Sequence, residues 1–187
     1  MTSGIPPNVF KVVQTLKDAG HRAFLVGGCV RDMLRGATPH DFDVATSATP
    51  EQVTALFPRV LPTGIAHGTV SVVFGNDFGS TLVEVTTFRS EGAYSDGRRP
   101  DEVKFETDIV ADLSRRDFTI NAMAYDPTTG EMVDPFGGRD DLAQKLVRCV
   151  GDARTRFLED GLRCMRAVRF ASTLGFDIHS TTFHAIE

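Results

Sequence analysis

The stretch Phe24-Leu-Val-Gly-Gly-Cys-Val-Arg-Asp32, followed nine residues later by Asp41-Phe-Asp-Val-Ala45, decides the fold of this chain. The apolar residues 23–26 predict a short buried strand. Gly27 and Gly28 come next, and two glycines allow the backbone to turn sharply and to approach a ligand closely. A helix can begin in the residues that follow, with its free N–H groups pointing at an anion.

Charged residues stand on both sides of this turn. Arg31 lies in the predicted helix 29–35, close enough to pair with an anion at its N-terminus. Asp41 and Asp43 are at i and i+2 of a second predicted strand, 41–45, so both carboxylates face one side of it. Two carboxylates beside a phosphate-binding turn can hold Mg²⁺ against a triphosphate for in-line attack on phosphorus. The combination predicts nucleotidyl transfer.

Each half alone has an ordinary structural explanation, a tight turn for Gly-Gly and a solvated strand end or helix cap for Asp-x-Asp. Together, in this order and spacing, they resemble the polymerase-beta-like nucleotidyltransferases, and among these the bacterial-type (class II) tRNA CCA-adding and poly(A) polymerase family. By this resemblance Asp41 and Asp43 are the catalytic ligands of Mg²⁺. The nucleotide-binding residues around the turn are then Gly27, Gly28, Arg31 and Asp32.

The order of apolar runs and turn signals predicts an α+β fold. The predicted elements are helix 9–18, strand 23–26, helix 29–35, strand 41–45, helix 50–56 capped by Thr49, strands 69–74 and 81–88 joined by residues 75–80, a loop over 89–100, strands 120–125 and 131–133 joined by a turn, helix 138–145, strand 146–150, and only helix from residue 153 onward.

These elements predict a small mixed sheet with helices on one face. The resemblance, which covers residues 23 to about 176, makes residues 1–147 the polymerase-beta-like catalytic head. Residues 148–187 are then the start of an all-helical neck, which is incomplete. Family members continue into further helical regions that grip the tRNA, so we expect most tRNA contacts to lie outside this sequence.

The composition is that of an ordinary globular chain of 187 residues, with 41% hydrophobic and 24% charged residues. Three scattered cysteines without Cys-x-x-Cys spacing favour a reducing compartment and argue against a zinc site. Because no apolar run approaches about 18 residues and no signal-peptide core is present, we expect a cytoplasmic protein without membrane association. The net charge of −5 is low for a nucleic-acid enzyme, but six arginines gather in residues 148–169.

Glu84 is the candidate third carboxylate of the catalytic set. It stands in Leu82-Val-Glu-Val85, within a predicted strand. A single glutamate in a strand usually faces solvent, and that explanation stays open. In the superfamily that the chain resembles, however, a third carboxylate on a neighbouring strand often completes the metal site.

A second block, Leu113-Ser-Arg-Arg-Asp-Phe-Thr-Ile-Asn-Ala-Met-Ala124, combines planar donors for phosphates with acceptors for a ribose hydroxyl. Three such residues could also form an Arg–Asp ion pair that anchors a turn. The block matches the Arg-Arg-Asp-Phe-Thr-Ile-Asn-Ala pattern of the family. By this resemblance Arg116, Asp117 and Asn121 bind the ribose and the triphosphate.

A third block, Glu159-Asp-Gly-Leu-Arg-Cys-Met-Arg-Ala-Val-Arg-Phe170, places Asp160 and Arg163 one turn apart on a predicted helix. The pair is either an ordinary salt bridge or a reader of bases. An arginine donor and an aspartate acceptor match cytosine and adenine and mismatch uracil and guanine, so such a site accepts CTP and ATP and rejects UTP and GTP. The block resembles the Glu-Asp-x-x-Arg templating element of the family, with Arg166 and Arg169 toward the phosphates.

Two further stretches separate the branches of the family. Thr63-Gly-Ile-Ala-His-Gly-Thr-Val-Ser-Val72 resembles the Gly-x-x-His-Gly-Thr-Val of CCA-adding enzymes, and residues 89–103 resemble the flexible loop of complete CCA-adding and A-adding enzymes. The sequence therefore favours addition of C and A to tRNA 3′ ends. A bacterial-type poly(A) polymerase is the alternative within the family. A catalytically silent nucleotide- or RNA-binding module is the alternative of another class.

Overall fold

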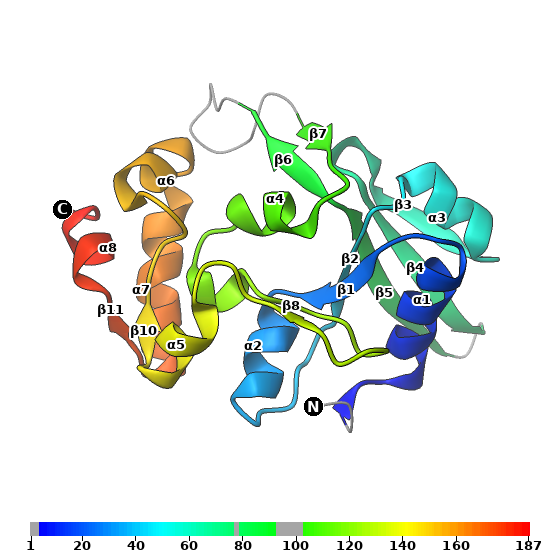
Figure 1. The fold of residues 1–187 in the computed structure, drawn as a ribbon, viewed down its shortest axis with the longest axis horizontal. Coiled ribbons are helices and arrows are strands. Elements are labelled where there is room, and N and C mark those ends of the chain that lie inside the picture. The colour runs from blue at the N-terminus through cyan, green and yellow to red at the C-terminus, as the bar shows by residue number, and fades with distance from the viewer. Residues whose placement is uncertain (1–3, 77–78, 93–102) are drawn as a thin grey trace.

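The computed structural model describes residues 4–76, 79–92 and 103–187 (Figure 1). Its helices are α1 Pro7–Asp18, α2 Gly28–Leu34, α3 Pro50–Leu56, α4 Ile109–Ser114, α5 Gly138–Ala143, α6 Ala153–Glu159, α7 Leu162–Leu174 and α8 Ser180–His184. Its strands are β1 Ala23–Val26, β2 Asp43–Thr46, β3 Val60–Gly64, β4 Thr69–Asn76, β5 Gly79–Thr87, β6 Arg89–Glu91, β7 Val103–Phe105, β8 Ala124–Tyr125, β9 Met132–Val133, β10 Leu146–Val147 and β11 Asp177–Ile178. Two short 3₁₀ turns are η2 Ile65–His67 and η3 Thr119–Asn121.

A mixed seven-stranded sheet in the order β3-β4-β5-β2-β1-β8-β9 forms the centre of the molecule. Within it β2 and β5 run parallel, and the other neighbouring strands are antiparallel. The expected α+β class is therefore confirmed. The parallel pair matters for function because it sets Asp43 of β2 directly beside Glu84 of β5.

Helices cover both faces of the middle of this sheet, in contrast to the expectation of helices on one face (Figure 1). On one face α1 and α3 pack onto the sheet through alternate strand residues such as Leu25 and Val44. On the opposite face Ile109 and Leu113 of α4 pack against Phe24 and Ala45 and the other residues of a second apolar cluster. Because alternate strand residues point to opposite faces, β1 is buried on both sides and is a continuous apolar run, whereas β2 is buried only after the exposed Asp43.

Several helix ends follow local sequence rules. Thr49 caps α3 through a reciprocal capping box with Gln52, and Pro50 occupies the first helical position, as predicted. α2 begins at Gly28, directly after Gly27 with φ of +76°, and no side chain caps its first turn. A positive φ at this position favours glycine because a Cβ would be strained there.

The C-terminal part forms a third apolar cluster. Phe157, Ala167 and Phe176 from the segment after residue 150 pack onto Phe118 and Ile120. The expectation of only helix from residue 153 was wrong, because β11 pairs in parallel with β10 between α7 and α8. Strand β10 is also shorter than the predicted 146–150 and belongs to this small two-stranded sheet.

Three other predictions need correction. Asp41 precedes strand β2, which begins at Asp43. Residues 120–121 lie in the 3₁₀ turn η3, and only Ala124–Tyr125 pairs with β9. The expected loop over 89–100 begins instead as strand β6, which pairs with β7, and residues 93–102 lie outside the described residues.

Candidate active site

Three carboxylates meet at one end of the parallel strand pair. Asp43 and Glu84 are register partners on β2 and β5, and Asp41 stands two residues before Asp43. All three side chains are exposed to solvent. The structure thus places the three carboxylates that the sequence predicts to be catalytic near one another, on the surface of the sheet rather than in its core.

The carboxylates raise the pKa values of their neighbours. Partial burial raises the pKa of Asp43, and Asp41 raises it further, against an opposing effect of the Arg116 guanidinium. Partial burial likewise raises the pKa of Glu84, followed by the charges of Asp43 and Asp41. Like charges held close together resist ionisation unless a cation neutralises them. A divalent cation bound between these carboxylates would relieve their mutual repulsion, as in a metal-binding site.

The donor set fits a hard divalent cation. Among the described residues, no three His, Cys, Asp or Glu side chains stand close enough to enclose a metal ion by themselves. Magnesium rarely needs such a cage, because it is usually held by one or two carboxylates together with substrate phosphates and water. Asp43 with Asp41 or Glu84 supplies that number of carboxylates.

We expect Glu84→Gln to raise the melting temperature of the metal-free chain at pH 7. A carboxyl whose pKa is raised in the folded state destabilises the fold when it is ionised, so stability falls as the pH rises through that pKa. The gain should vanish below the ordinary pKa of 4.5, where the wild-type side chain is also neutral. Thermal denaturation in a chelator at pH 7 and pH 4 measures the effect.

The control for this prediction is Glu131→Gln, which removes the charge of another exposed glutamate, distant from Glu84 in the sequence. It should leave the melting temperature unchanged at both pH values. Added Mg²⁺ should stabilise the wild type more than the Glu84 variant. A lower melting temperature for Glu84→Gln at pH 7 would mean that Glu84 forms a stabilising contact and feels no repulsion.

The glycine turn lies directly beside the carboxylates. A Cβ at Gly27 would stand 3.0 Å from Nη1 of Arg116 and 3.9 Å from Oδ2 of Asp43. A side chain at position 27 would crowd this arginine, and the positive φ there also favours glycine. Nε of Arg116 is buried and has no hydrogen-bond partner in the structure. A guanidinium with one donor unused, beside Asp43, marks a place where an anion can bind next to a carboxylate.

A chain of polar contacts joins five of the predicted nucleotide-binding residues. Arg31 donates to Asp32 through Nε at 2.9 Å and to Oδ1 of Asn121 through Nη1 at 2.8 Å. Asn121 donates to Oδ1 of Asp117 at 3.3 Å, and Oδ2 of Asp117 accepts from Nε of Arg166 at 2.7 Å. Residues from α2, η3 and α7 are therefore held in one network.

Arg31 is more tightly held than the sequence indicates. Its side chain is buried, with 9% of the residue exposed, and it donates to carboxylate and amide oxygens rather than standing free for an anion. Its guanidinium lies over the turn, where a Cβ at Gly28 would stand 3.5 Å from Nη2. The structure thus fixes this cation at the start of α2.

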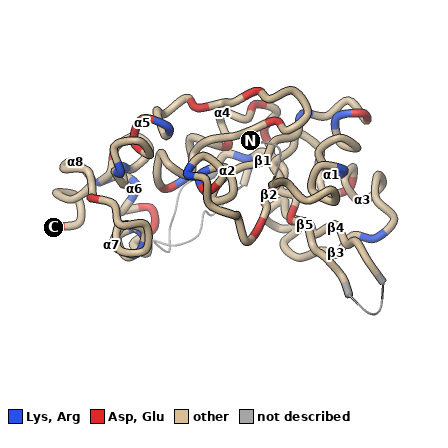
Figure 2. Tube along the Cα trace, turned by 90° about the horizontal axis from the view of Figure 1, so that it is seen from below, with Lys and Arg blue, Asp and Glu red and all other residues tan. Residues whose placement is uncertain are grey.

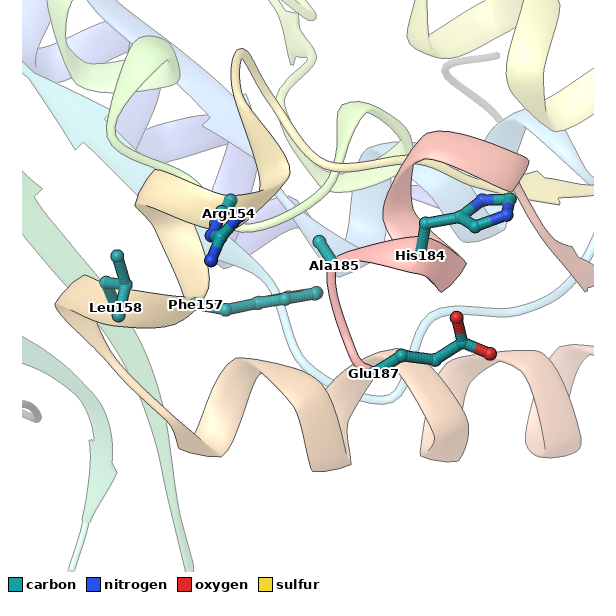
Figure 3. Close-up of a pocket in the computed structure, with 6 residues that line it drawn as sticks. All are labelled: Arg154, Phe157, Leu158, His184, Ala185 and Glu187. Carbon is teal, nitrogen blue, oxygen red and sulfur yellow. The ribbon is translucent and has the colours of Figure 1, made fainter.

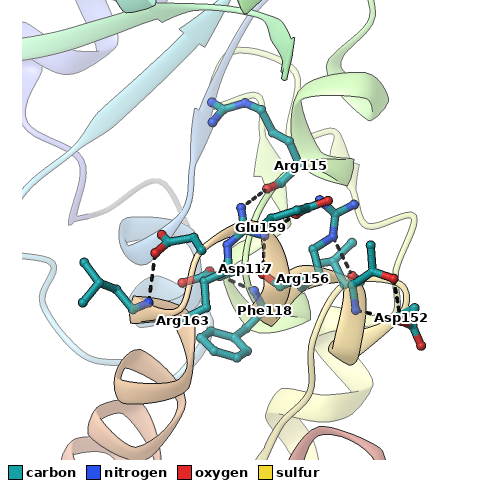
Figure 4. A network of polar contacts seen from close by, with 11 residues as sticks. Arg115, Asp117, Phe118, Asp152, Arg156, Glu159 and Arg163 are labelled. Carbon is teal, nitrogen blue, oxygen red and sulfur yellow. Dashed lines mark hydrogen bonds and ion pairs between the residues drawn. The ribbon is translucent and has the colours of Figure 1, made fainter. Parts of the chain in front are cut away.

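The pair Asp160 and Arg163 does not lie on one helix, contrary to prediction. Asp160 ends α6 in an extended conformation, and α7 begins only at Leu162. Arg163 instead donates to Oε2 of Glu159 at 2.6 Å, as Figure 4 shows. It also donates to the backbone carbonyl of Arg115 at 3.4 Å. In this structure Arg163 links α7 to the end of α4.

The sequence analysis missed Asp112. This residue of α4 is fully buried, and its carboxylate accepts from Arg115 and Arg116 as well as from the backbone N–H of Arg89. The available signal was its position four residues before Arg116, because residues at this spacing become neighbours where the chain is helical, and Arg116 lies just beyond the end of α4. Asp112 holds Arg116 in place beside Gly27 and Asp43.

The pocket in Figure 3 lies away from the carboxylates. It is lined by Phe157 and Leu158 of α6 together with His184 and Ala185 at the end of α8. In the described part of the chain, no helix is long and apolar enough to cross a membrane.

A family model described as the poly A polymerase head domain matches residues 23–148. The chain belongs to this family. A CCA-adding enzyme of Oceanobacillus iheyensis is 51% identical over 175 residues, which are 94% of this chain and 42% of that protein. The chain thus spans less than half the length of the curated relatives that it matches.

Solved structures agree with this assignment. The chain resembles the CCA-adding enzyme of Bacillus stearothermophilus in complex with CTP, with a TM-score of 0.86 and 44% identity over 97% of this chain and 43% of that one. It also resembles a tRNA nucleotidyltransferase complexed with a primer tRNA and an incoming ATP analogue, with a TM-score of 0.72 and 32% identity over 94% of this chain and 48% of that one. The family and the fold are therefore established independently of the site geometry.

Proposed function

We propose that the chain is the catalytic head of an enzyme that adds C and A from CTP and ATP to tRNA 3′ ends and releases pyrophosphate. The main support for this proposal is that Asp43 and Glu84 lie side by side near the glycine turn. Arg116, whose Nε has no hydrogen-bond partner, lies next to this turn. The relatives named as CCA-adding enzymes support this branch of the family over a poly(A) polymerase.

Each side chain has a task in this proposal. Asp41 and Asp43 bind Mg²⁺, which polarises the phosphate and activates the attacking hydroxyl when it is bound. Glu84 adds negative charge at the same edge. Arg116 and the N–H groups at the start of α2 bind the triphosphate, because cations and helix N-termini both attract phosphate. Asp117 and Asn121 orient the ribose. Catalysis then rests mainly on positioning and electrostatic stabilisation.

The surroundings of the site fit a nucleotide but offer little surface for RNA. Figure 2 shows basic residues recurring along α2, α6 and α7, while the chain as a whole carries a net charge of −5. Phosphate contacts dominate nucleic-acid affinity, so we propose that regions present in the longer relatives supply most of the tRNA contacts. The boundary between head and neck after residue 147 belongs to the same proposal.

We also propose a cytoplasmic location. All three cysteines are free, and burial raises the pKa values of the Cys29 and Cys149 thiols to about 11. Both thiols therefore stay protonated and unreactive at neutral pH. Free structural thiols are typical of a reducing compartment.

Base selection by Asp160 and Arg163 stays a prediction. Arg163 already donates to Glu159 and to the backbone carbonyls of Arg156 and Arg115, so a nucleotide base would compete with these contacts. We expect Arg163→Ala to weaken the preference for CTP and ATP over UTP and GTP by about 1–3 kcal/mol. Rates of incorporation of each labelled nucleotide measure this preference, with Arg154→Ala on the exposed side of α6 as the control. An equal loss for all four nucleotides would make Arg163 a structural residue.

The activity itself is tested with tRNA that ends at the discriminator base. The chain is incubated with this tRNA, Mg²⁺ and each nucleoside triphosphate separately or together, and the 3′ ends are then sequenced. Ends extended by C, C and A support the proposal. A run of adenosines would indicate poly(A) synthesis instead, and unchanged ends with intact nucleotide binding would indicate a silent binding module.

A further inference from the structure

Phe170 of α7 stands at the centre of three arginines. The guanidinium carbons of Arg166 and Arg169 lie 5.3 Å from its ring centroid, and that of Arg31 lies 5.4 Å away. Each of these distances is within the range of a cation–π contact. One ring thus contacts cations from two different elements, α2 and α7.

The ring itself is held in a fixed orientation. Phe118, which is fully buried, packs edge-on against Phe170 with a centroid distance of 5.7 Å and an interplanar angle of 82°. Asp117, which directly precedes Phe118, binds Arg166 through its carboxylate. Contact with Phe118, which directly precedes η3, therefore fixes the ring of Phe170 while the ring also contacts the arginines.

The surrounding charges do not balance. Among the described residues, Asp32 pairs with Arg31 and also with Arg35, and Asp117 pairs with Arg166, so two carboxylates face the three guanidinium groups. Three like charges around one ring repel each other unless the ring and the carboxylates offset the repulsion. The excess positive charge favours an anionic ligand. The guanidinium of Arg31 also lies over Gly28, which connects this cluster with the turn beside Asp43.

We propose that Phe170 is a positioning residue that holds Arg166 and Arg169 together as triphosphate-binding cations, against the buried and already paired Arg31. This inference rests on the proposed function and assigns a task to an aromatic residue that makes no hydrogen bond. The ring fixes cations from α2 and from α7 against each other before the nucleotide arrives. Preorganised cations bind a triphosphate more tightly because less side-chain entropy is lost on binding.

The test compares binding of CTP, ATP and inorganic tripolyphosphate to the 187-residue chain by calorimetry in the presence of Mg²⁺. Phe170→Leu keeps apolar bulk but removes the aromatic ring. We expect it to weaken all three ligands by the same factor, about five- to tenfold. Phe170→Tyr keeps the ring and should restore wild-type affinity. Phe183→Leu, at an exposed phenylalanine of α8, is the matched control and should change nothing.

Each outcome decides the inference. Unchanged affinities in a folded Phe170→Leu chain would overturn it, and so would a loss of CTP and ATP binding with tripolyphosphate binding intact. Weaker tRNA binding with unchanged CTP binding would assign the cluster to RNA phosphates and overturn it as well. If Phe170→Leu does not fold, Arg169→Gln on the exposed face of α7 takes its place, and a loss of at least threefold for tripolyphosphate is then expected. If the wild type binds tripolyphosphate but shows no preference for CTP and ATP, the proposed function fails while the cluster stands.

Discussion

Asp43→Asn should abolish nucleotide transfer and leave the fold intact. Asp43 is an exposed residue at the start of β2, so its side chain contributes little to packing. Its pKa is raised by partial burial and by Asp41, which means that the folded chain tolerates loss of its charge easily. The chemistry requires that charge on the metal ion. We expect the rate to fall by at least about a thousandfold, which corresponds to about 4 kcal/mol in the barrier.

Incorporation of labelled CTP into tRNA lacking its 3′ end measures this loss at saturating Mg²⁺. Asp177→Asn, in the small sheet of β10 and β11, replaces another exposed aspartate and should keep the wild-type rate. The melting temperature of the Asp43 variant should equal or exceed that of the wild type. Retention of more than about a tenth of the rate would contradict the metal assignment.

Asp112→Ala should have the largest effect on stability. Asp112 is 0% exposed, and its Oδ1 accepts from Arg115 at 2.9 Å while Oδ2 accepts from Arg116 at 3.1 Å. Removal of the carboxylate takes away the negative charge that Asp112 supplies to two partly buried guanidinium groups. The expected loss is about 3–5 kcal/mol of unfolding free energy. Nucleotide binding should weaken as well, because Arg116 loses the contact that holds it beside Gly27.

Urea denaturation measures this loss, and Lys104→Ala provides the contrast. Lys104 forms an exposed ion pair with Glu106 at 3.7 Å, and removal of such a pair costs at most about 1 kcal/mol. Burial raises the pKa of Asp112, but Arg116 and Arg115 outweigh it and lower the pKa overall. The contribution of Asp112 is therefore present above its ordinary pKa of 3.8 and lost only as the pH falls further. If Asp112→Ala lowered the unfolding free energy at pH 7 by less than about 1 kcal/mol, the proposed stabilising role of the ion pairs of Asp112 with Arg115 and Arg116 would be contradicted.

The sequence predicts those elements whose local signals agree with their environment. Strand β1 was placed correctly because four buried apolar residues end at two glycines, and α3 because Thr49, Pro50 and Gln52 encode its start. Strand β3 was missed. It carries mostly exposed side chains and contains Pro62, so neither alternation nor burial marks it as an edge strand.

Side-chain partners were harder to predict than elements. Arg163 was matched with Asp160 on the assumption of one continuous helix, but the chain breaks at Gly161 and the arginine pairs with Glu159. The role of β11 depends on pairing with β10, about thirty residues earlier, and a two-residue strand has no local signature. By contrast, Asp43 and Glu84 could be matched because the motif resembles a family in which the two strands are neighbours.

Binding of CTP to the 187-residue chain with and without Mg²⁺ tests the central claim most directly. Calorimetric titrations with CTP, ATP, UTP and GTP are compared with the same titrations of Asp43→Asn. We predict saturable, Mg²⁺-dependent binding of CTP and ATP, weaker binding of UTP and GTP, and loss of the metal dependence in the variant. Equal binding of CTP by wild type and variant, unaffected by Mg²⁺, would contradict the assignment of Asp41 and Asp43 as the metal-binding residues of a nucleotidyltransferase site.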